Sequence, residues 1–314
     1  MTTKILQQKM PGKKLAIRIK KLIPLYIMLS PAVVCTLIFN YYPMYGAQIA
    51  FKDYKLALGI EHSPWVGLKH FIAFFQSYNF SRIMRNTITL SIYSIFASFL
   101  IVIILSLSLH CLRGDMIRKM VQTVVYIPHF ISTVVIVGII LRMFNPNLGT
   151  LSKLIQSMGS TNRDLMGVNS AFPHIYVWSN IWQNAGWGTI IYLATLSGID
   201  PQLHEAAIVD GATRLQRVRH IDIPAIIPIA IIILIMDCGK IMDVGFEKIL
   251  LMQNSLNISS SEVISTYVYK VGIATGRPNY SMSSAIGLFN SIINFLLIII
   301  VNSISKSLKQ NSLW

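Results

Sequence analysis

The stretch S-S-A-I-G-L-F-N-S-I-I-N-F-L-L-I-I-I-V-N-S, residues 283–303, holds no charged side chain. A helix of roughly 20 apolar residues crosses the hydrocarbon core of a bilayer, so this stretch predicts a membrane-spanning helix. Five more windows of similar length carry few charges. The six windows are residues 22–42, 87–112, 120–143, 173–196, 223–245 and 283–303. Together they predict an all-α membrane protein with six transmembrane helices.

The composition of the 314-residue chain supports this fold class. Hydrophobic residues make up 54% of the chain and charged residues only 12%, against about 25% charged in a typical soluble domain. The net charge is +15, which in a soluble protein would suggest binding to nucleic acid. In a multispanning protein basic residues instead gather in cytoplasmic loops. We therefore expect contact with the lipid bilayer and no nucleic acid.

The distribution of cations predicts the orientation. Residues 13–21 are rich in Lys and Arg, which is typical of a basic helix on the inner leaflet. With the N-terminus inside, the inner segments carry more Lys and Arg than the outer loops, although the outer loops are longer, so both termini are expected in the cytoplasm. The predicted units are a basic segment (1–21), a six-span permease domain (22–303) and a cytoplasmic tail (304–314). Within the domain we expect an ordered outer loop at 51–86 and a cytoplasmic loop at 200–222.

The cytoplasmic loop between the fourth and fifth windows reads D-P-Q-L-H-E-A-A-I-V-D-G-A, residues 200–212. Asp200 can cap a helix whose first residue is Pro201. Gly211 accepts a positive φ where that helix must stop. A second, basic helix over 213–220 should then enter the fifth span at Pro224. The loop is thus predicted to be a short exposed helix followed by a turn and another helix.

The same loop has a surface suited to contact with another protein. The small side chains of Ala206 and Ala207 allow a partner to approach closely, and Glu205 and Asp210 offer charge to it. An ordinary solvated connection between two spans is the alternative, since E-A-A alone is a common helical sequence. The full pattern E-A-A-x-x-D-G-A, followed by Val218, Ile221 and Pro224, is more specific.

This pattern resembles the cytoplasmic loop of the membrane subunits of ABC importers. The resemblance implies the transmembrane-domain fold of ABC type I importers, in which the loop forms coupling helices that seat in a groove of a separate ATPase subunit. The residues it implies for coupling to the ATPase are Glu205, Ala206, Ala207, Asp210, Gly211 and Arg214.

Three further runs look like the carbohydrate-uptake branch, specifically its LplB-type oligosaccharide permeases: S-P-W-V-G-L (63–68), V-G-F-E (244–247) and V-I-S-T-Y-V-Y (263–269). This resemblance implies import of a saccharide, such as an oligosaccharide, by alternating access across the bacterial cytoplasmic membrane. The implied partners are a second homologous permease subunit, two ATPase subunits and an extracellular or periplasmic solute-binding protein.

No enzymatic or cofactor site is predicted in this chain. ATP hydrolysis needs a phosphate-binding loop, G-x-x-x-x-G-K-[ST], and neither Gly-Lys pair, at Gly12 and Gly239, fits that pattern. Cys35, Cys111 and Cys238 lie far apart, with no C-x-x-C pair and no His at ligand spacing. We therefore expect no catalytic residue, no cofactor and no metal ligand, and an ATPase on another polypeptide.

Polar residues inside spans usually face a watery cavity or the bundle interior. On the fourth span Tyr176, Asn180, Gln183 and Trp187 form one stripe at helical spacing, which suits a sugar because aromatic faces cover its C–H side while amides bond its hydroxyls. Asn290 belongs to a similar stripe on the sixth span. Helix packing is the alternative for both stripes. Trp178 and Trp182 fall on the opposite side of the fourth span.

The fifth span carries three charged residues spaced three apart, Asp237, Lys240 and Asp243. On one helix Lys240 can reach both carboxylates. The three side chains then either neutralise one another or grip a polar saccharide. The carboxylates also leave open a proton-coupled secondary transporter, and the importer could move a solute other than a sugar. A membrane-embedded enzyme would need converging acids, histidines or metal ligands in the spans, and the two carboxylates lack such company.

Overall fold

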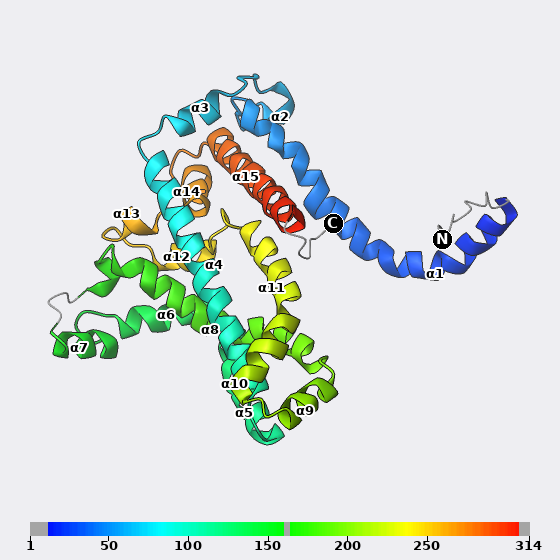
Figure 1. Ribbon diagram of the computed structural model, residues 1–314. Helices are drawn as coiled ribbons and strands as arrows, with labels where there is room; N and C mark the ends of the chain where they lie inside the picture. The colour runs from blue at the N-terminus through cyan, green and yellow to red at the C-terminus, as the bar shows by residue number, and fades with distance from the viewer. Residues whose placement is uncertain (1–11, 160–163, 308–314) are drawn as a thin grey trace.

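The computed structural model describes residues 12–159 and 164–307, whose regular structure is helical apart from one isolated β-bridge between Lys52 and Trp65 (Figure 1). The α-helices are α1 (Gly12–Thr36), α2 (Gly59–His62), α3 (Lys69–Phe75), α4 (Phe80–His110), α5 (Asp115–Tyr126), α6 (Thr133–Met143), α7 (Thr150–Ser157), α8 (Ala171–Ser197), α9 (Pro201–Val209), α10 (Arg214–Arg217), α11 (Ile223–Cys238), α12 (Phe246–Met252), α13 (Ile258–Ser261), α14 (Ile264–Tyr269) and α15 (Tyr280–Ser307). Short π segments are η1 (Leu37–Tyr41), η5 (Val218–Asp222) and η6 (Lys270–Ala274), and short 3-10 segments are η2 (Tyr42–Phe51), η3 (Ile127–Phe130) and η4 (Leu165–Gly167).

Four helical stretches of the described residues are long and apolar enough to cross a membrane, which confirms the predicted class. They are Leu22–Phe51, Phe80–His110, Arg214–Cys238 and Tyr280–Ser307. A fifth is obtained if the bent pair Asp115–Phe130 and Thr133–Met143 counts as one span. Helix α8 has 27 residues and is not among the candidates, because its amides and three tryptophans lower its hydropathy.

The third predicted window, 120–143, is wrong as a single straight helix. Its two halves meet at an angle of 94°. Pro128, in η3, has no N–H to continue the helical hydrogen bonding. Ser132 then caps the new helix α6, since its side chain accepts a hydrogen bond from the Val135 N–H at 3.4 Å. A proline followed by a capping serine therefore turns the chain inside an apolar window.

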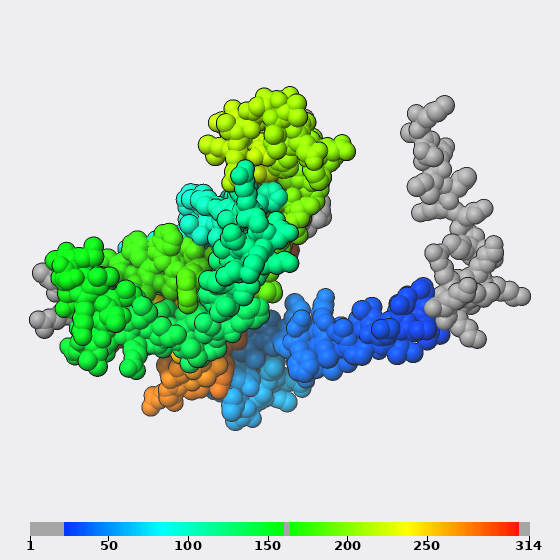
Figure 2. Space-filling view, turned by 90° about the horizontal axis from the view of Figure 1, so that it is seen from below, coloured from blue at the N-terminus to red at the C-terminus, as the bar shows by residue number. Residues whose placement is uncertain are grey.

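The first span differs from its predicted limits at both ends. Helix α1 already begins at Gly12, so the basic residues 13–21 continue into the span instead of forming a separate helix. The helical path runs on through η1 and η2 to Phe51. In this arm, residues 22–51, η2 packs beside α15 and the preceding part leads away from the rest of the molecule (Figures 1 and 2). The 18-residue apolar window within this arm has none of its residues buried.

Helix α8 lies at the centre of the packed body, alongside α4. A cluster of buried apolar side chains surrounds its first half, including Phe172, Val177 and Ile181. A second cluster joins its last turns to α11. Gly186 marks the contact between α8 and α5, because a Cβ at this position would lie 2.2 Å from the carbonyl oxygen of Val125. Only glycine permits so close an approach of the two backbones.

The segment between the first and second spans folds against the body. Phe74 of α3 is buried in a cluster with residues of α4 and α15. Lys52 donates a hydrogen bond from its Nζ to the carbonyl of Ile60 at 2.6 Å and lies over the ring of Trp65. Helix α4 begins at Phe80, so the second span starts earlier than the predicted residue 87.

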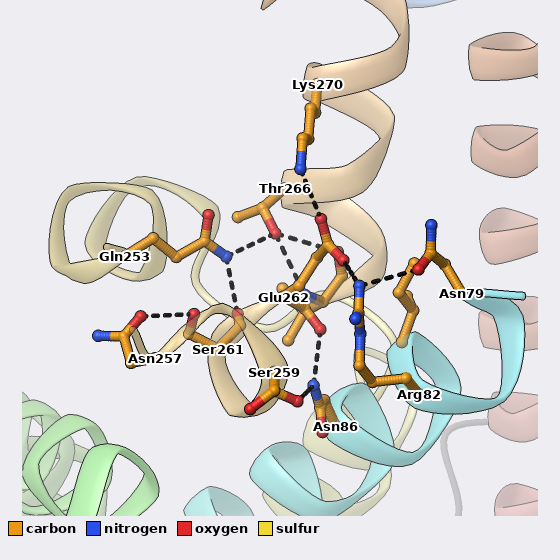
Figure 3. A network of polar contacts seen from close by, with 12 residues as sticks. Asn79, Arg82, Asn86, Gln253, Asn257, Ser259, Ser261, Glu262, Thr266 and Lys270 are labelled. Carbon is orange, nitrogen blue, oxygen red and sulfur yellow. Dashed lines mark hydrogen bonds and ion pairs between the residues drawn. The ribbon is translucent and has the colours of Figure 1, made fainter. Parts of the chain in front are cut away.

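A polar network fastens the connection between α12 and α15 to the start of α4 (Figure 3). Glu262 is 1% exposed and accepts hydrogen bonds from the Arg82 guanidinium and, at 3.2 Å, from Lys270. Asn86 donates to the backbone carbonyls of Ser259, at 2.9 Å, and of Glu262, at 3.1 Å. These contacts join segments far apart in the sequence and hold the polar backbone of the connection in place.

Candidate functional site: the cytoplasmic loop and two cavities beside α8

The loop after α8 has the predicted helix–turn–helix form. Asp200 caps α9, since its carboxylate accepts a hydrogen bond from the Gln202 N–H at 3.0 Å. Gly211 has a φ of 78°. The N–H groups of Gly211 and Ala212 return to the carbonyls of Ile208, at 3.0 Å, and Ala207, at 2.8 Å. This is a Schellman motif, in which a left-handed residue ends the helix.

The second helix is capped independently of the first. Thr213 and Gln216 exchange side-chain and backbone hydrogen bonds in a capping box. Helix α10 then continues through η5 into α11 without interruption. The fifth span therefore continues without a break from the helix that follows the turn at Gly211.

The loop presents an exposed surface. No residue of α9 is buried, and the apolar side chains of Leu203, Ile208 and Val209 are largely exposed. A cavity of about 330 Å³ lies between the two helices and is lined by Ala207, Asp210, Gly211, Ala212, Gln216, Arg217, His220 and Ile221. Apolar side chains beside such a cavity are typical of a docking surface.

The structure brings most of the predicted coupling residues together. Ala207, Asp210 and Gly211 line the cavity between the helices, and Glu205 and Ala206 are exposed on α9. Arg214 differs from them, because its guanidinium donates to the carbonyl of Cys111 at the end of α4, at 3.4 Å. Arg214 thus ties the second helix of the loop to α4.

The predicted stripe on α8 divides between two environments. Tyr176 and Gln183 are buried. The amide oxygen of Gln183 accepts a hydrogen bond from Lys248 at 3.2 Å, and its Nε2 lies 3.4 Å from the carbonyl of Ile131. Burial lowers the pKa of Lys248 to about 8. The Gln183 side chain is therefore a structural link between α8, the bend after η3 and α12.

Three residues of the stripe, Tyr176, Asn180 and Gln183, line one cavity. Its volume is about 250 Å³, and its walls come from α6, α8 and the start of α12: Thr133, Tyr176, Asn180, Gln183, Asn184, Gly245, Phe246, Glu247 and Lys248. Amide, phenol and charged groups dominate this list. Such groups can exchange hydrogen bonds with a polar solute.

Trp187 belongs to a second cavity. Its indole is half-exposed, stacks on His129 with ring centres 4.6 Å apart, and meets Phe130 edge-on at 6.0 Å. The second cavity, of about 400 Å³, is lined by Trp187 together with Asp237 and Lys240 among mostly apolar residues. Asn184 lines both cavities. Trp178 and Trp182 are exposed, away from both.

The predicted ion-pair ladder on the fifth span is not observed. Helix α11 ends at Cys238, so Lys240 and Asp243 follow a turn and are not on one helical flank with Asp237. No ion pair within 4.0 Å joins Lys240 to a carboxylate in the described residues. Asp243 instead accepts hydrogen bonds from Asn290 at 2.7 Å and Asn294 at 2.8 Å. Two amides of α15 thus solvate the carboxylate that Lys240 was expected to neutralise.

Two residues that line these cavities, Asn184 and Lys248, and one beside them, His129, were not predicted from the sequence. Asn184 lies four residues after Asn180 and donates to its side chain at 3.0 Å, so helical spacing could have found it. His129 contacts Asn184 at 3.0 Å, and its position inside an apolar window was a usable signal. Lys248 lies in a connection between spans, and no sequence signal indicated that it turns inward.

The fold defines a class: a helical protein with several candidate membrane spans and an exposed helix–turn–helix loop between α8 and α11. Residues 101–310 match the family described as the binding-protein-dependent transport system inner membrane component. The chain belongs to this family. It is therefore a multi-pass inner membrane permease subunit of a bacterial ABC importer, and not the ATPase subunit.

Two relatives and two solved structures show how far the likeness extends. Protein LplB of Bacillus subtilis (strain 168) is 40% identical over 92% of this chain and 91% of its own length. The polygalacturonan/rhamnogalacturonan transport system permease protein YteP of the same organism is 36% identical over 99% and 96%.

The first structure is a bacterial ABC transporter involved in the import of the acidic polysaccharide alginate. It matches with a TM-score of 0.85 at 37% identity, covering 95% of this chain and 100% of that chain. A bacterial alginate ABC transporter in complex with an alginate pentasaccharide-bound periplasmic protein also gives 0.85, at 36% identity, covering 94% and 98%.

Proposed function

We propose that this permease imports an oligosaccharide, and that the solute is acidic. The acidity of the solute is inferred from Lys248. This residue is 5% exposed and lines the cavity of about 250 Å³ beside α8. Among the described residues no carboxylate lies within 4.0 Å of its ammonium group. An uncompensated buried ammonium is costly. A passing uronate would relieve this cost, and relatives named for polygalacturonan and alginate support the same chemistry.

The substrate path in this proposal runs along α8. Tyr176, Asn180 and Gln183 line the cavity that contains Lys248, and Trp187 lines the second cavity with Asp237 and Lys240. Asp243, which follows α11, and Asn290 of α15 form a hydrogen-bonded pair. In this proposal the pair contacts the solute outside the two cavities. Ring stacking on Trp187 and hydrogen bonds from the amides suit a chain of sugar rings.

The transport cycle depends on the loop at 200–222. The exposed α9, with Glu205, Ala206 and Ala207 on it, seats in a groove of an ATPase subunit, while Asp210, Gly211 and Arg214 fix the turn and the second helix. Closure of the ATPase dimer moves the loop and shifts the permease from inward-open to outward-open, because ATP binding favours one of the two states. A second permease subunit, two ATPase subunits and an external solute-binding protein complete the assembly.

The topology in this proposal has six spans and both termini in the cytoplasm. The spans are the arm from Leu22 to Phe51, α4, the bent pair α5–α6, α8, α11 and α15. The separation of α2–α3 from α9–α10 at opposite ends of the molecule supports an outer loop at 51–86 and an inner loop at 200–222 (Figure 1). Residues 1–21 and 304–314 are then the cytoplasmic segment and tail.

Uptake by the assembled importer tests the acidic specificity. The complete complex, with its binding protein, is reconstituted in proteoliposomes and given oligogalacturonate, alginate oligosaccharide or neutral maltooligosaccharide. We expect ATP-dependent uptake of an acidic oligosaccharide and its loss in Lys248→Met, with Lys153→Met, an exposed lysine of α7, as the matched control. Uptake of the neutral sugar alone, or equal uptake by both variants, would overturn the acidic assignment.

A further inference from the structure

Three side chains converge behind the cytoplasmic loop at a place that the transport proposal does not use. They are His110 at the end of α4, His204 of α9 and Asp222 at the end of η5. One ligand atom from each lies within 4.8 Å of the others. The Asp222 Oδ1 is 3.3 Å from the His204 Nε2 and 3.9 Å from the His110 Nε2. The histidine rings face the same carboxylate oxygen from two different helices.

The polar atoms at the centre of this cluster lack hydrogen bonds. Asp222 is 2% exposed, yet its Oδ1 has no hydrogen-bond partner among the described residues, and neither does the His204 Nε2. A buried carboxylate oxygen without a partner is costly and calls for a cation, a proton or a ligand. Two imidazole nitrogens aimed at it supply lone pairs as well as charge. Both observations indicate a site made for a cation that accepts nitrogen and oxygen ligands.

We propose that His110, His204 and Asp222 bind a divalent transition metal ion of the zinc type. Zinc bonds to imidazole nitrogen and carboxylate oxygen are about 2.0–2.2 Å long, so neighbouring ligand atoms of a tetrahedral site lie roughly 3.3 Å apart. The His204–Asp222 distance already has this value, and the His110 Nε2 lies 3.9 Å from the same carboxylate oxygen. Two histidines and a carboxylate with one open position are a zinc ligand set.

The surroundings supply the fourth position. A cavity of about 340 Å³ opens beside the three ligands, with room for water, and the Cys111 side chain also lines it. Arg113, Arg214 and Arg217 line the same cavity further out. Their positive charge favours an anionic fourth ligand, such as hydroxide, over neutral water. The arginines raise the electrostatic cost of a bound cation, and the Asp222 carboxylate together with an anionic fourth ligand offsets the charge of the metal.

The position of the site gives the metal a consequence for coupling. Its ligands come from the end of one span, from the exposed helix α9 and from the start of the fifth span. Bound metal would link α9 to both spans by coordinate bonds, in place of the weaker contact between His204 and Asp222 at 3.3 Å. Metal occupancy would therefore set how rigidly the loop follows the ATPase.

Zinc and cobalt binding to the full-length permease in detergent micelles tests the proposal without any transport assay. After chelation and dialysis, we expect one Zn²⁺ per chain by elemental analysis, and visible absorption of tetrahedral Co²⁺ that Zn²⁺ displaces. His204→Gln and Asp222→Asn should each weaken Zn²⁺ binding by more than about tenfold, since even outer-shell changes cost that much. His220→Ala, on the same loop, is the matched control because its ring bonds to the Gln216 carbonyl and His220 is not in the cluster of three ligands.

The wild-type chain keeps the test decisive if a variant does not fold. Substoichiometric Zn²⁺ together with an octahedral Co²⁺ spectrum in the folded wild-type protein would overturn the proposal. An equal loss of binding in His220→Ala and His204→Gln would do the same, because it would show nonspecific binding by histidines of the loop.

Discussion

Replacing Gly211 by valine should lower both binding-protein-stimulated ATP hydrolysis and uptake. A Cβ at Gly211 would meet nothing within 4 Å, so there is no steric clash with neighbours. The cost lies in the backbone, because the φ of 78° is in the left-handed region that a β-branched residue rarely adopts. We therefore expect a purely conformational penalty.

The magnitude follows from the two states of the turn. Holding an L-residue in the left-handed region costs about 1–2 kcal/mol. Leaving that region instead breaks the hydrogen bonds from Gly211 to Ile208 and from Ala212 to Ala207, each of which contributes about 0.5–1.5 kcal/mol. The strained turn therefore costs about 1–2 kcal/mol and the broken turn about 1–3 kcal/mol. A loss of about 1–2 kcal/mol lowers the population of the native turn by a factor of roughly 5–30.

The assay is binding-protein-stimulated ATPase activity and uptake in the reconstituted complex. Stimulated activity and uptake should fall by several-fold, while membrane insertion remains normal. Gly211→Asn should retain most of both, because asparagine tolerates the left-handed region. Gly67→Val is the control for strain alone, since Gly67 has a φ of 59° on the outer loop and equally open space. Wild-type stimulation and uptake in Gly211→Val would refute the reasoning that this turn transmits motion.

Three other perturbations have expected outcomes. Trp187→Ala should lower saccharide uptake by losing a ring contact of about 0.5–1.5 kcal/mol, whereas Trp178→Leu should leave selectivity unchanged; equal effects on uptake would return the α8 stripe to helix packing. Glu262→Gln should destabilise the permease by about 2–3 kcal/mol. This is below the roughly 3–5 kcal/mol expected for a fully buried ion pair, because Arg82 is partly exposed. An unchanged melting temperature would contradict a stabilising role of the Arg82–Glu262 pair. The pKa of Lys248 falls from 10.5 to about 8 on folding, so stability should rise between about pH 8 and 10.5, where the unfolded chain binds more protons; Lys248→Met should lose this rise, and an identical pH profile would count against the buried ammonium.

The local chemistry of the coupling loop could be predicted from sequence because it depends on neighbours in the chain. Asp200 as a cap and Gly211 as the stop of α9 both act within one helical turn. The bend at Pro128 and Ser132 carried comparable local signals, yet apolar content alone does not reveal a change in helix direction. Window hydropathy therefore finds apolar segments better than it finds straight spans.

The polar contacts of the spans could not be predicted in the same way, because they join distant segments. Asp243 finds its partners, Asn290 and Asn294, on another helix. Helical spacing on the fifth span predicted Lys240 as the partner instead. That prediction assumed that the helix continues to Asp243, whereas α11 ends at Cys238. The cluster of His110, His204 and Asp222 is a stronger case, since ligands so far apart in the chain match no spacing pattern for metal ligands.

Site-specific cross-linking from α9 tests most directly that the loop at 200–212 docks on the ATPase. Val209→Cys, at a side chain 87% exposed, is made in a chain whose Cys35, Cys111 and Cys238 are replaced by serine, and a short bifunctional thiol reagent is added to the assembled complex. Trp65→Cys, on the outer loop, is the matched control. If the loop docks on the ATPase, we expect a permease–ATPase cross-link from position 209 and none from position 65. A cross-link from position 65, with none from position 209, would show that α9 does not contact the ATPase.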